Sequence, residues 1–534
     1  MLRARLLPSP FRTPFHCRHA SSARRPSTRW TVGLFSGGAL LAAALVSLPP
    51  IRAEAAPADP TTDMTLGELA RAYAVFTLCS FPTLVDNSPR LLQLATAPGI
   101  RWVGERFVRW TFFDQVSTRE WGTTRIWIFV GGETAEKTLP LLYKLRAVNK
   151  GALFAYSVEV DESEATGSPS ATKAPSPHKR IVDEMIHCVD VAADFEDGVA
   201  GKQHTGRRTW VAIKMSALLP DANILVRFSS HLLTTRPDRS IAYPGCPHPS
   251  DLDALANPAA AALNAHDLAA LRDLHADLAR ICARAQERGV RIIVDAEYSW
   301  YQPAIDALTL SLSRRFNKPP ARADKGQHAA AVQPLVTPAL LAQALADAKA
   351  GGYALGVKLV RGAYHPHEVA AHKARVARAP SLLLSSSSEP EEEEEPEGAH
   401  VWLAKRETDA CYDACVRVLV RAVREDVRAS AGAGGDARAP RLGVLFGTHN
   451  WASCDVILGE LVRSGLAARG GAGGELVVVP DEVAERVAIG QLYGMCDDLT
   501  NYLVNKTACA TPLIINVVGF FPGDAVPEPP GDRE

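Results

Sequence analysis

Short runs rich in Val, Ile and Leu alternate with helical patterns from about Gly132 onward. Each run has the length of a buried strand, and each intervening segment has room for a crossover helix, so the pattern predicts parallel strands. The runs are ALFAYSVEV, TWVAIKMSAL, RIIVDAE, the short PLV, YALGVKLVR, RLGVLFGTHN, RVAIGQLYG and PLIIN. Together they predict an α/β fold, a distorted (β/α)8 barrel of the TIM type.

Polar or glycine-containing turns directly follow several of these runs, among them DAEYSW, RGAY and THN. A β/α barrel keeps its active site at the C-terminal ends of its strands, so these turns bring reactive side chains to one place. A doubly wound open sheet is the alternative architecture. It is disfavoured because no GxGxxG sequence follows an early strand to bind a dinucleotide pyrophosphate.

The composition is that of a globular protein, with 47% hydrophobic and 22% charged residues among 534. The net charge of -1 gives no field that attracts nucleic acid.

The ten cysteines lack CxxC pairs and zinc-site spacing, so we expect reduced thiols and no metal site. Cys411 and Cys415 lie four positions apart and share a helix face. We expect them to pack in the core, and a role in redox or metal chemistry is the alternative. The acidic run Glu391–Glu395 is a solvated loop or, alternatively, a docking site for a basic partner.

The N-terminal segment has the composition of a mitochondrial transit peptide, because it is rich in Arg, Ser and Ala and its first acidic residue is Glu54. Within it, Thr31–Ile51 is almost uncharged and close to the roughly 20 residues that a membrane helix needs. It is a candidate membrane segment, with a sorting signal or an apolar tail as the alternatives. We expect a presequence over residues 1–51, a linker and helical arm over 52–131, and the barrel over 132–516.

Two carboxylates, Asp295 and Glu297, lie two residues apart at the end of an apolar run, so their side chains point the same way. Their repulsion raises the pKa of one of them unless a cation or hydrogen bonds compensate. The natural partner of Asp295 is Lys214, because a lysine inside the apolar run TWVAIKMSAL must be paired or functional. A structural ion pair without a catalytic role is the alternative.

Four strings occur in a fixed order: TWVAIKMSAL with RIIVDAE, then GGYALGVKLVRGAYHPHE, then FGTHNWAS, then AIGQLYGM. In this order they resemble the signatures of the proline dehydrogenase family, from about Leu66 to Asn516. The resemblance implies a flavin-bearing barrel that oxidises L-proline to 1-pyrroline-5-carboxylate with FAD and passes the electrons to a membrane quinone. It also implies a mitochondrial address, at the inner membrane or on its matrix side, and no nucleic-acid partner.

The resemblance also implies roles for individual residues. On the substrate side, Lys214 binds the proline carboxylate, Asp295 holds Lys214 in place, and Tyr364 and Leu492 line the proline pocket. Lys358 lies against the flavin, where its charge stabilises negative charge that develops during the reaction. The other residues implied to bind the cofactor are Gly362, Ala363, Thr448, His449, Asn450 and Gln491.

The chain also departs from the family pattern in three places. VSTREWGTTRIWI is an extra segment, and a strand-end segment of TYQ type is absent after PLV. After Asn516 the chain continues as an atypical tail, residues 517–534, in place of a strand and a helix that carries paired arginines. We therefore expect a barrel that is incomplete at its C-terminal strand and helix. An inactive or weakened relative that binds FAD, and another flavin barrel enzyme such as a methylenetetrahydrofolate reductase relative, are the alternatives.

Overall fold

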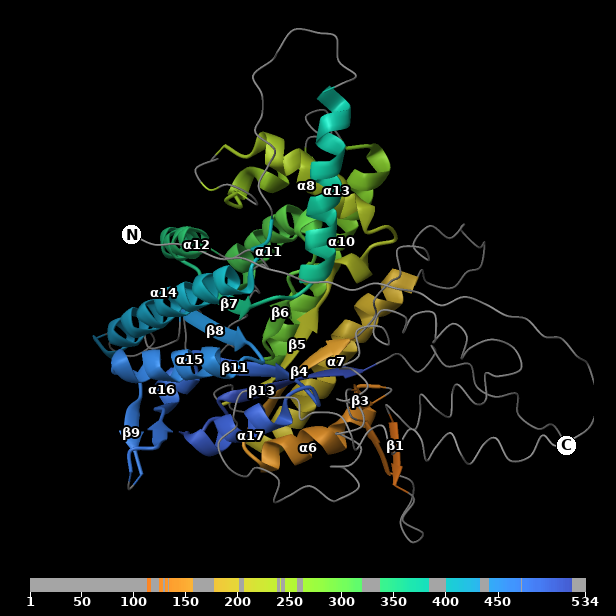
Figure 1. Cartoon of the computed structure of the whole chain (residues 1–534). Helices are drawn as coiled ribbons and strands as arrows, with labels where there is room; N and C mark the ends of the chain where they lie inside the picture. The colour runs from red at the N-terminus through yellow and green to blue at the C-terminus, as the bar shows by residue number, and fades with distance from the viewer. Residues whose placement is uncertain are drawn as a thin grey trace, which may run out of the picture. The chain divides into compact units, whose positions relative to one another are not determined.

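The computed structural model describes residues 113–116, 124–127, 130–132, 134–156, 177–200, 206–237, 241, 245–256, 263–318, 337–383, 400–432, 441–471 and 473–520. All of them belong to one unit, Pro60–Glu534. The described part is an α/β barrel with its helices outside the sheet (Figure 1).

One parallel sheet runs in the strand order β6-β5-β4-β13-β11-β8-β7. Its strands are β4 (Lys150–Tyr156), β5 (Thr209–Ile213), β6 (Ile292–Val294), β7 (Leu355–Val360), β8 (Leu442–Gly447), β11 (Val487–Leu492) and β13 (Ile514–Phe520). A further short strand, β3 (Val130–Gly132), pairs with the end of β13. β6 and β7 are the two edges of this sheet. Within the described residues no strand lies between them and they do not pair with each other, so the barrel is nearly closed. The predicted TIM-type fold is confirmed, and seven of the eight predicted runs are strands; the eighth, PLV, lies outside the described residues.

Both faces of the sheet are covered, which explains why the strands are almost continuously apolar. On β7, Val357 and Leu359 are buried among side chains of the surrounding helices. Alternation along the strand places Lys358 on the opposite face, toward the barrel interior. The same alternation on β11 gives Gln491 to the helix side and Leu492 to the interior side.

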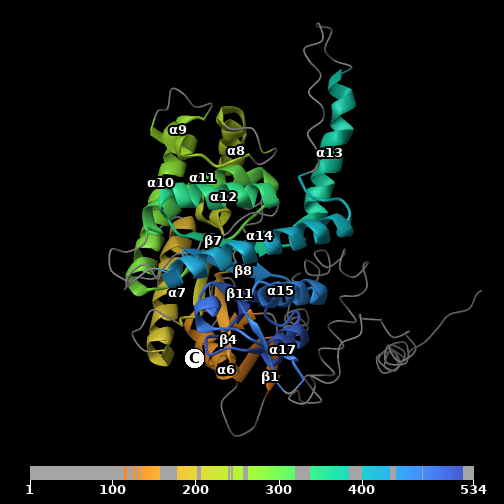
Figure 2. The ribbon, with the colours of Figure 1, turned by 90° about the vertical axis from the view of Figure 1, so that its left-hand side faces the viewer.

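Two groups of helices cover the barrel (Figures 1 and 2). The first packs around β4, β5 and β6 and consists of α7 (Pro177–Ala200), α8 (Asn223–Thr235), α10 (Ala265–Arg288) and α11 (Gln302–Phe316). The second packs on β7, β8 and β11 and consists of α12 (Pro338–Gly351), α14 (Lys405–Gly432), α15 (Trp451–Arg463) and α17 (Asp497–Lys506). A further helix, α13 (His365–Leu383), follows β7 and extends away from the barrel in Figure 2.

Local sequence signals set the ends of these helices. Asn264 accepts a hydrogen bond from the backbone of Asp267 at the start of α10, and Thr337 caps α12 in the same way. Gly289 and Gly352 end the two helices at φ 66°, a left-handed conformation that favours glycine. Each helix is therefore delimited before the strand that follows it.

The expected interruption of the last strand after Asn516 is wrong. β13 continues to Phe520 and lies between β4 and β11 in the sheet. The physical reason is that Val517 and Val518 are β-branched, and the first proline of the tail comes only at Pro522. The strand is therefore present, and residues 521–534 lie outside the described residues.

The expected helical arm lies mostly outside the described residues. Its described portion is extended: β1 (Phe113–Val116) pairs in antiparallel fashion with β2 (Thr124–Trp127). The described residues at the end of the expected arm, 113–115, thus lie in a strand, and the aromatic and β-branched residues of these segments favour strands. The rest of the expected arm stays a prediction. The extra segment of the sequence contributes β2.

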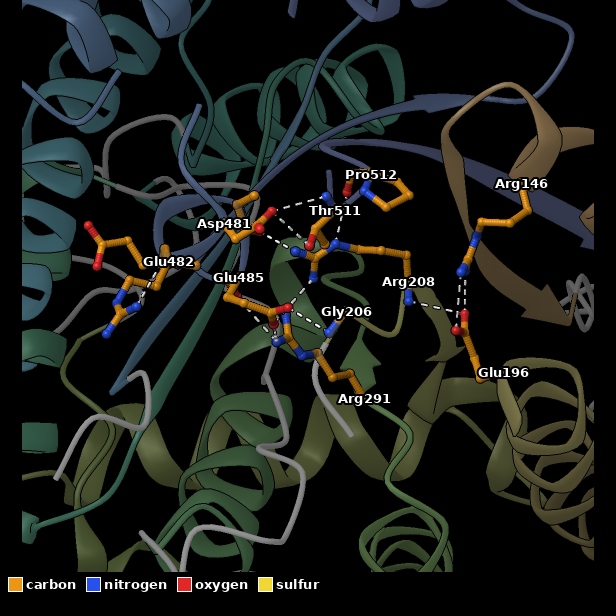
Figure 3. Close-up of polar contacts among 12 residues, drawn as sticks. Arg146, Glu196, Gly206, Arg208, Arg291, Asp481, Glu482, Glu485, Thr511 and Pro512 are labelled. Carbon is orange, nitrogen blue, oxygen red and sulfur yellow. Dashed lines mark hydrogen bonds and ion pairs between the residues drawn. The ribbon is translucent and has the colours of Figure 1, made fainter. Parts of the chain in front are cut away.

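A buried network of charges closes the N-terminal end of the barrel (Figure 3). Arg208 and Arg291 directly precede β5 and β6, and both approach Glu485: Arg291 donates to its carboxylate at 3.2 Å, and an Arg208 nitrogen lies 3.9 Å away. Arg208 also donates to the carbonyl of Pro512 at 2.8 Å. Burial lowers the pKa of Arg208 to about 10. At this end of a barrel such contacts serve stability.

A second carboxylate supports the same network. Glu196 accepts hydrogen bonds from the backbone of Arg208 at 3.0 Å and from the hydroxyl of Thr209 at 2.6 Å. It also forms an ion pair with Arg146. The end of α7 is thereby tied to the start of β5.

No described helix has both the length and the apolar character that would cross a membrane. The candidate membrane segment Thr31–Ile51 lies outside the described residues. None of the eight cysteines in the described part forms a disulfide.

Candidate active site

An ion pair joins the two edge strands at the C-terminal end of the barrel. Lys358, on β7, donates to the carboxylate of Asp295, the residue directly after β6. Both side chains are largely buried, at 14% and 16% exposure. The expected requirement of Asp295 for a cation is met by Lys358, and the pairing of Asp295 with Lys214 stays a prediction.

Glu297 is buried and bonded to the segment after β5. It accepts a hydrogen bond from the backbone of Ser216 at 3.0 Å and another from the Ser216 hydroxyl. Burial raises the pKa of Glu297, whereas Ser216 and the charge of Lys214 lower it. One carboxyl of the pair thus has a raised pKa, as the sequence predicted, but burial contributes more than its neighbour Asp295.

The turn after β7 is held in a left-handed conformation, with Gly362 at φ 73° and Tyr364 at φ 59°. The ring of Tyr364 lies 4.6 Å from that of Tyr298, measured between centroids. Tyr298 in turn stacks on Trp300 at 4.5 Å, and its hydroxyl lies 2.9 Å from Nδ1 of His367. An aromatic cluster therefore connects the segment after β6 to the turn after β7.

Hydrogen bonds to Glu368 hold the same two segments together. Its buried carboxylate accepts from the backbone of Ser299 at 2.6 Å and from the Ser299 hydroxyl at 2.8 Å. His400 lies 3.3 Å from that hydroxyl, and burial followed by the charge of Arg375 lowers its pKa to about 4. Glu368 could have been found from the sequence, because a glutamate follows KLVRGAY in the family signature.

Arg361 does not point into the barrel in the way that Lys358 does. It donates to the Ser453 hydroxyl at 2.6 Å and pairs with Asp409. Its guanidinium carbon lies 5.6 Å from the centre of the Tyr412 ring. Arg361 therefore fixes the end of β7 to α14 and α15.

The THN turn after β8 is anchored by its own polar groups. The backbone of Thr448 donates to the carbonyl of Gly490 at 3.1 Å, which continues the β8–β11 pairing. Asn450 caps α15, because its side-chain oxygen accepts from the backbone of Ser453 at 2.9 Å. These two bonds fix the position of His449 between them.

His449 and Gln491 have hydrogen-bond partners within the protein. His449 Nε2 accepts from the backbone of Leu492 at 3.0 Å, and burial lowers its pKa, which favours the neutral ring. Gln491 donates to the carbonyl of Thr448 at 3.1 Å and accepts from the Thr500 hydroxyl at 3.3 Å. These bonds hold Gln491 on the helix side of the sheet, and its contact with a flavin stays a prediction.

The residues at this end of the barrel fit a flat, partly apolar, anionic group. Leu492 and Met495 are large apolar side chains that remain 43% and 49% exposed beside the end of β11. Among the described residues, no atom lies within 4 Å of the position that a Cβ of residue 362 would take, so these residues leave the backbone of Gly362 open to a ligand. Lys358, which lies on β7 shortly before Gly362, supplies a cation on the interior side of that strand.

The proline dehydrogenase family profile matches residues 156–382 and 386–519, which include every strand of the barrel from β5 to β11 and most of β13. The chain belongs to the proline dehydrogenase family. Its members include oxidoreductases that act on proline, in line with the resemblance of the sequence strings. The match begins at the end of β4 and breaks only at residues 383–385, near the end of α13.

Individual relatives are distant. Hydroxyproline dehydrogenase of Xenopus laevis is 28% identical over 303 residues, which are 56% of this chain and 57% of that protein. Mitochondrial proline dehydrogenase 1 of Dictyostelium discoideum is 25% identical over 261 residues, 47% of this chain and 39% of that protein. Among solved structures, proline utilization A of Bdellovibrio bacteriovorus inactivated by N-propargylglycine has 15% identity and a TM-score of 0.46, over 74% of this chain and 30% of that one.

The structure thus brings most of the predicted site residues to one end of the barrel. These residues lie at or just after the C-terminal ends of strands: Lys214, Asp295, Lys358, Gly362, Ala363, Tyr364, Thr448, His449, Asn450 and Leu492. The sequence did not reveal the aromatic contacts of Tyr298 or the bonds of Ser299 to Glu368. Both depend on the pairing of segments that are about seventy positions apart.

Proposed function

We propose that this chain binds FAD noncovalently and oxidises L-proline to 1-pyrroline-5-carboxylate, the first step of proline catabolism to glutamate. The observation that carries the proposal is the Lys358–Asp295 ion pair at the C-terminal end of the barrel, where Lys214 also lies. The family match and the exposed apolar surface at Leu492 support it. A barrel places its chemistry at this end.

When bound at this end of the barrel, FAD would supply the hydride-accepting chemistry for the oxidation of proline at C5. Lys214 binds the substrate carboxylate, and Leu492 packs against the apolar side of the proline ring. Lys358 supplies positive charge where negative charge develops during hydride transfer. Asp295 fixes the position of the Lys358 ammonium through their ion pair. Together these residues hold the substrate amine and carboxylate in one orientation, which is the main contribution of the protein to such a reaction.

The cellular setting follows from the same family. A mitochondrial relative and the transit-peptide composition of residues 1–51 support a mitochondrial location. A membrane quinone would take the electrons, which places the protein at the inner membrane or on its matrix side.

A second candidate is a flavin-binding relative with weak or no activity toward proline. It is favoured because the next arginine after Arg486 is Arg533, so residues 521–534 lack the arginine pair that the family resemblance implies for this region. Lys214 alone cannot reproduce the two-pronged geometry with which paired arginines bind a carboxylate.

The test is the absorbance of bound flavin in the purified full chain under anaerobic conditions. Bleaching on addition of L-proline, followed by reduction of a quinone analogue, supports the proposal. A bound flavin that proline leaves oxidised supports the second candidate. Bleaching by NAD(P)H but not by proline would instead indicate a barrel enzyme of the methylenetetrahydrofolate reductase type.

A further inference from the structure

A buried carboxylate joins the two segments that follow the edge strands β6 and β7. Glu368 lies in the first turn of α13, and its two oxygens accept hydrogen bonds from the backbone of Ser299 at 2.6 Å and from the Ser299 hydroxyl at 2.8 Å. Glu368 is 2% exposed and Ser299 is 5% exposed. Among the described residues no hydrogen-bonded strand pairing joins β6 to β7. This contact and the Lys358–Asp295 ion pair therefore supply links that the sheet does not.

The two residues on either side of Ser299 carry aromatic rings. Tyr298 stacks on Trp300 with 4.5 Å between the ring centroids and 7° between the planes. The Tyr298 ring also lies 4.6 Å from that of Tyr364, in the turn after β7. Ser299 lies between Tyr298 and Trp300 in the sequence. Its hydrogen bonds therefore fix the backbone from which both rings project.

The turn that carries Tyr364 depends on contacts from outside itself. Tyr364 has φ 59°, a left-handed conformation that is strained for a residue other than glycine and persists only where its surroundings hold it. The backbone of Glu368 donates to the Tyr364 carbonyl at 3.1 Å, and the Tyr298 ring packs against the Tyr364 ring. One contact thus comes from Glu368 itself, and the other comes from a ring whose backbone Glu368 fixes.

We propose that Glu368 is a positioning residue for Tyr364. By binding Ser299, its carboxylate holds the Tyr298 ring against the Tyr364 ring and so fixes the Tyr364 side chain at the C-terminal end of the barrel. The inference rests on the proposed function, in which the family resemblance implies that Tyr364 lines the proline pocket. Glu368 acts through its neighbours, so its loss changes proline binding and not flavin retention.

The experiment measures flavin reduction in the purified full chain over a series of L-proline concentrations. Glu368→Ala should raise the apparent Km for proline by roughly tenfold, because it displaces a residue that contacts the substrate, and should change the maximal rate far less. Flavin content per folded chain should stay at the wild-type value. A lower flavin content with an unchanged Km would overturn the proposal.

Two further variants separate positioning from a loss of stability. Glu368→Gln should stay close to wild type, because its amide oxygen can accept from the Ser299 backbone and its amide nitrogen can donate to the Ser299 hydroxyl oxygen. Glu485→Gln removes a carboxylate from the charge network at the opposite end of the barrel, so it should lower stability and leave the Km unchanged. An equal rise in Km in Glu485→Gln and Glu368→Ala would contradict the assignment.

A double-mutant cycle tests the path through Tyr298. Tyr298→Ala removes the ring that contacts Tyr364 and should raise the Km as Glu368→Ala does. The double variant should exceed either single variant by little, because both substitutions remove the same support. Tyr298→Phe keeps the ring and should keep most of the affinity. Full additivity of the two alanine substitutions would show that Glu368 does not act through Tyr298.

Hydrogen–deuterium exchange tests the position of Tyr364 without any enzyme activity. The amide of residue 368 bonds to the Tyr364 carbonyl and therefore reports on this turn. Its exchange should be faster in Glu368→Ala and in Tyr298→Ala, and unchanged in Glu485→Gln. Wild-type exchange in both alanine variants would overturn the inference. Faster exchange in a chain whose flavin L-proline leaves oxidised would support the positioning contact and refute only the proposed function.

Discussion

Lys358 and Asp295 form an ion pair between the only two barrel strands of the described residues that lack a hydrogen-bonded neighbour on one side. β6 and β7 are the edges of the sheet, and the side chains that meet between them carry the chemistry expected of the site. The ion pair therefore has two effects: it joins the two open edges of the sheet, and it fixes a cation on the barrel interior. Substitutions at this point should change ligand binding and not only stability.

The first prediction divides two lysines between two ligands. Lys358→Ala should weaken flavin binding or flavin reduction, because the substitution removes the interior cation and leaves Asp295 without its partner. Lys214→Ala should mainly raise the apparent Km for proline. The measurements are flavin content per folded chain and proline-dependent flavin reduction, with Lys405→Ala, an exposed lysine on α14, as the control. Equal effects of the two substitutions on both quantities would count against this division.

The second prediction concerns the N-terminal end of the barrel. Glu485→Gln removes the carboxylate that faces Arg208 and Arg291, and the loss of one partner from a buried charge network costs about 3 kcal/mol in the free energy of unfolding. Chemical denaturation measures the change. Glu482→Gln, an exposed position on the short helix α16 (Asp481–Ala484) directly before Glu485, is the matched control and should stay near the wild-type value. Similar stability of the two variants would show that the network contributes little.

The third prediction is a pH dependence that arises from Asp306 on α11. Burial raises its pKa from 3.8 to about 7, while Arg236 and a hydrogen bond from Gln302 oppose the shift and Asp251 adds to it. Between these two pH values the folded state keeps a proton that the unfolded state has lost, so the free energy of unfolding falls as the pH rises through this window. Above pH 7 this contribution is constant.

Asp306→Asn keeps the side chain neutral at every pH and removes this dependence. Relative to wild type, the variant should gain about 2 kcal/mol in the free energy of unfolding between pH 5 and pH 8. Urea denaturation at both pH values measures it. Asp267→Asn is the opposite control, because the hydrogen bond from Arg227 lowers the pKa of Asp267. Loss of the Asp267 carboxylate should lower the free energy of unfolding at both pH values. A difference between Asp306→Asn and wild type that does not change with pH would refute the assignment.

The fourth prediction concerns the tail. It separates the two candidate functions. If the second candidate is right, the chain as written has little or no proline dehydrogenase activity, because residues 521–534 carry no arginine pair that could bind the substrate carboxylate. Loss of a buried charged contact costs about 2 to 5 kcal/mol in binding, a factor of roughly 30 or more. The comparison is with a chain that carries a family-type ending, a strand followed by a helix with paired arginines, measured by proline-dependent reduction of a quinone analogue. Comparable turnover and affinity would show that other residues hold the carboxylate.

The barrel could be predicted from the sequence because its strands are buried on both faces and therefore read as separate apolar runs. At the C-terminus the same signal is present in the β-branched residues Val517 and Val518. The prediction followed the unfamiliar sequence after Asn516 instead and was wrong there. Because β13 reaches Phe520, the C-terminal departure from the family pattern begins only after this strand.

The partners of the charged residues could be predicted less well. Asp295 plainly required a cation, and Lys214 and Lys358 were both available at strand ends. Lys358 meets Asp295 because the sheet curls into a barrel and brings its two edge strands, β6 and β7, together. Arg208 and Arg291 had the appearance of ordinary charges before a strand, since nothing local shows that Glu485 lies between them. Such pairings depend on the strand order and on contacts between distant segments, and so the sequence leaves them open.

The central claim is that the C-terminal end of this barrel holds a flavin through noncovalent contacts, and the flavin content of the purified full chain tests it most directly. The protein is unfolded with denaturant, filtered, and the flavin in the filtrate is quantified against the protein retained. The account predicts close to one FAD per chain in the filtrate for the wild type and clearly less for Lys358→Ala. A folded chain that releases no flavin, or a flavin that stays attached to the unfolded protein, would contradict it.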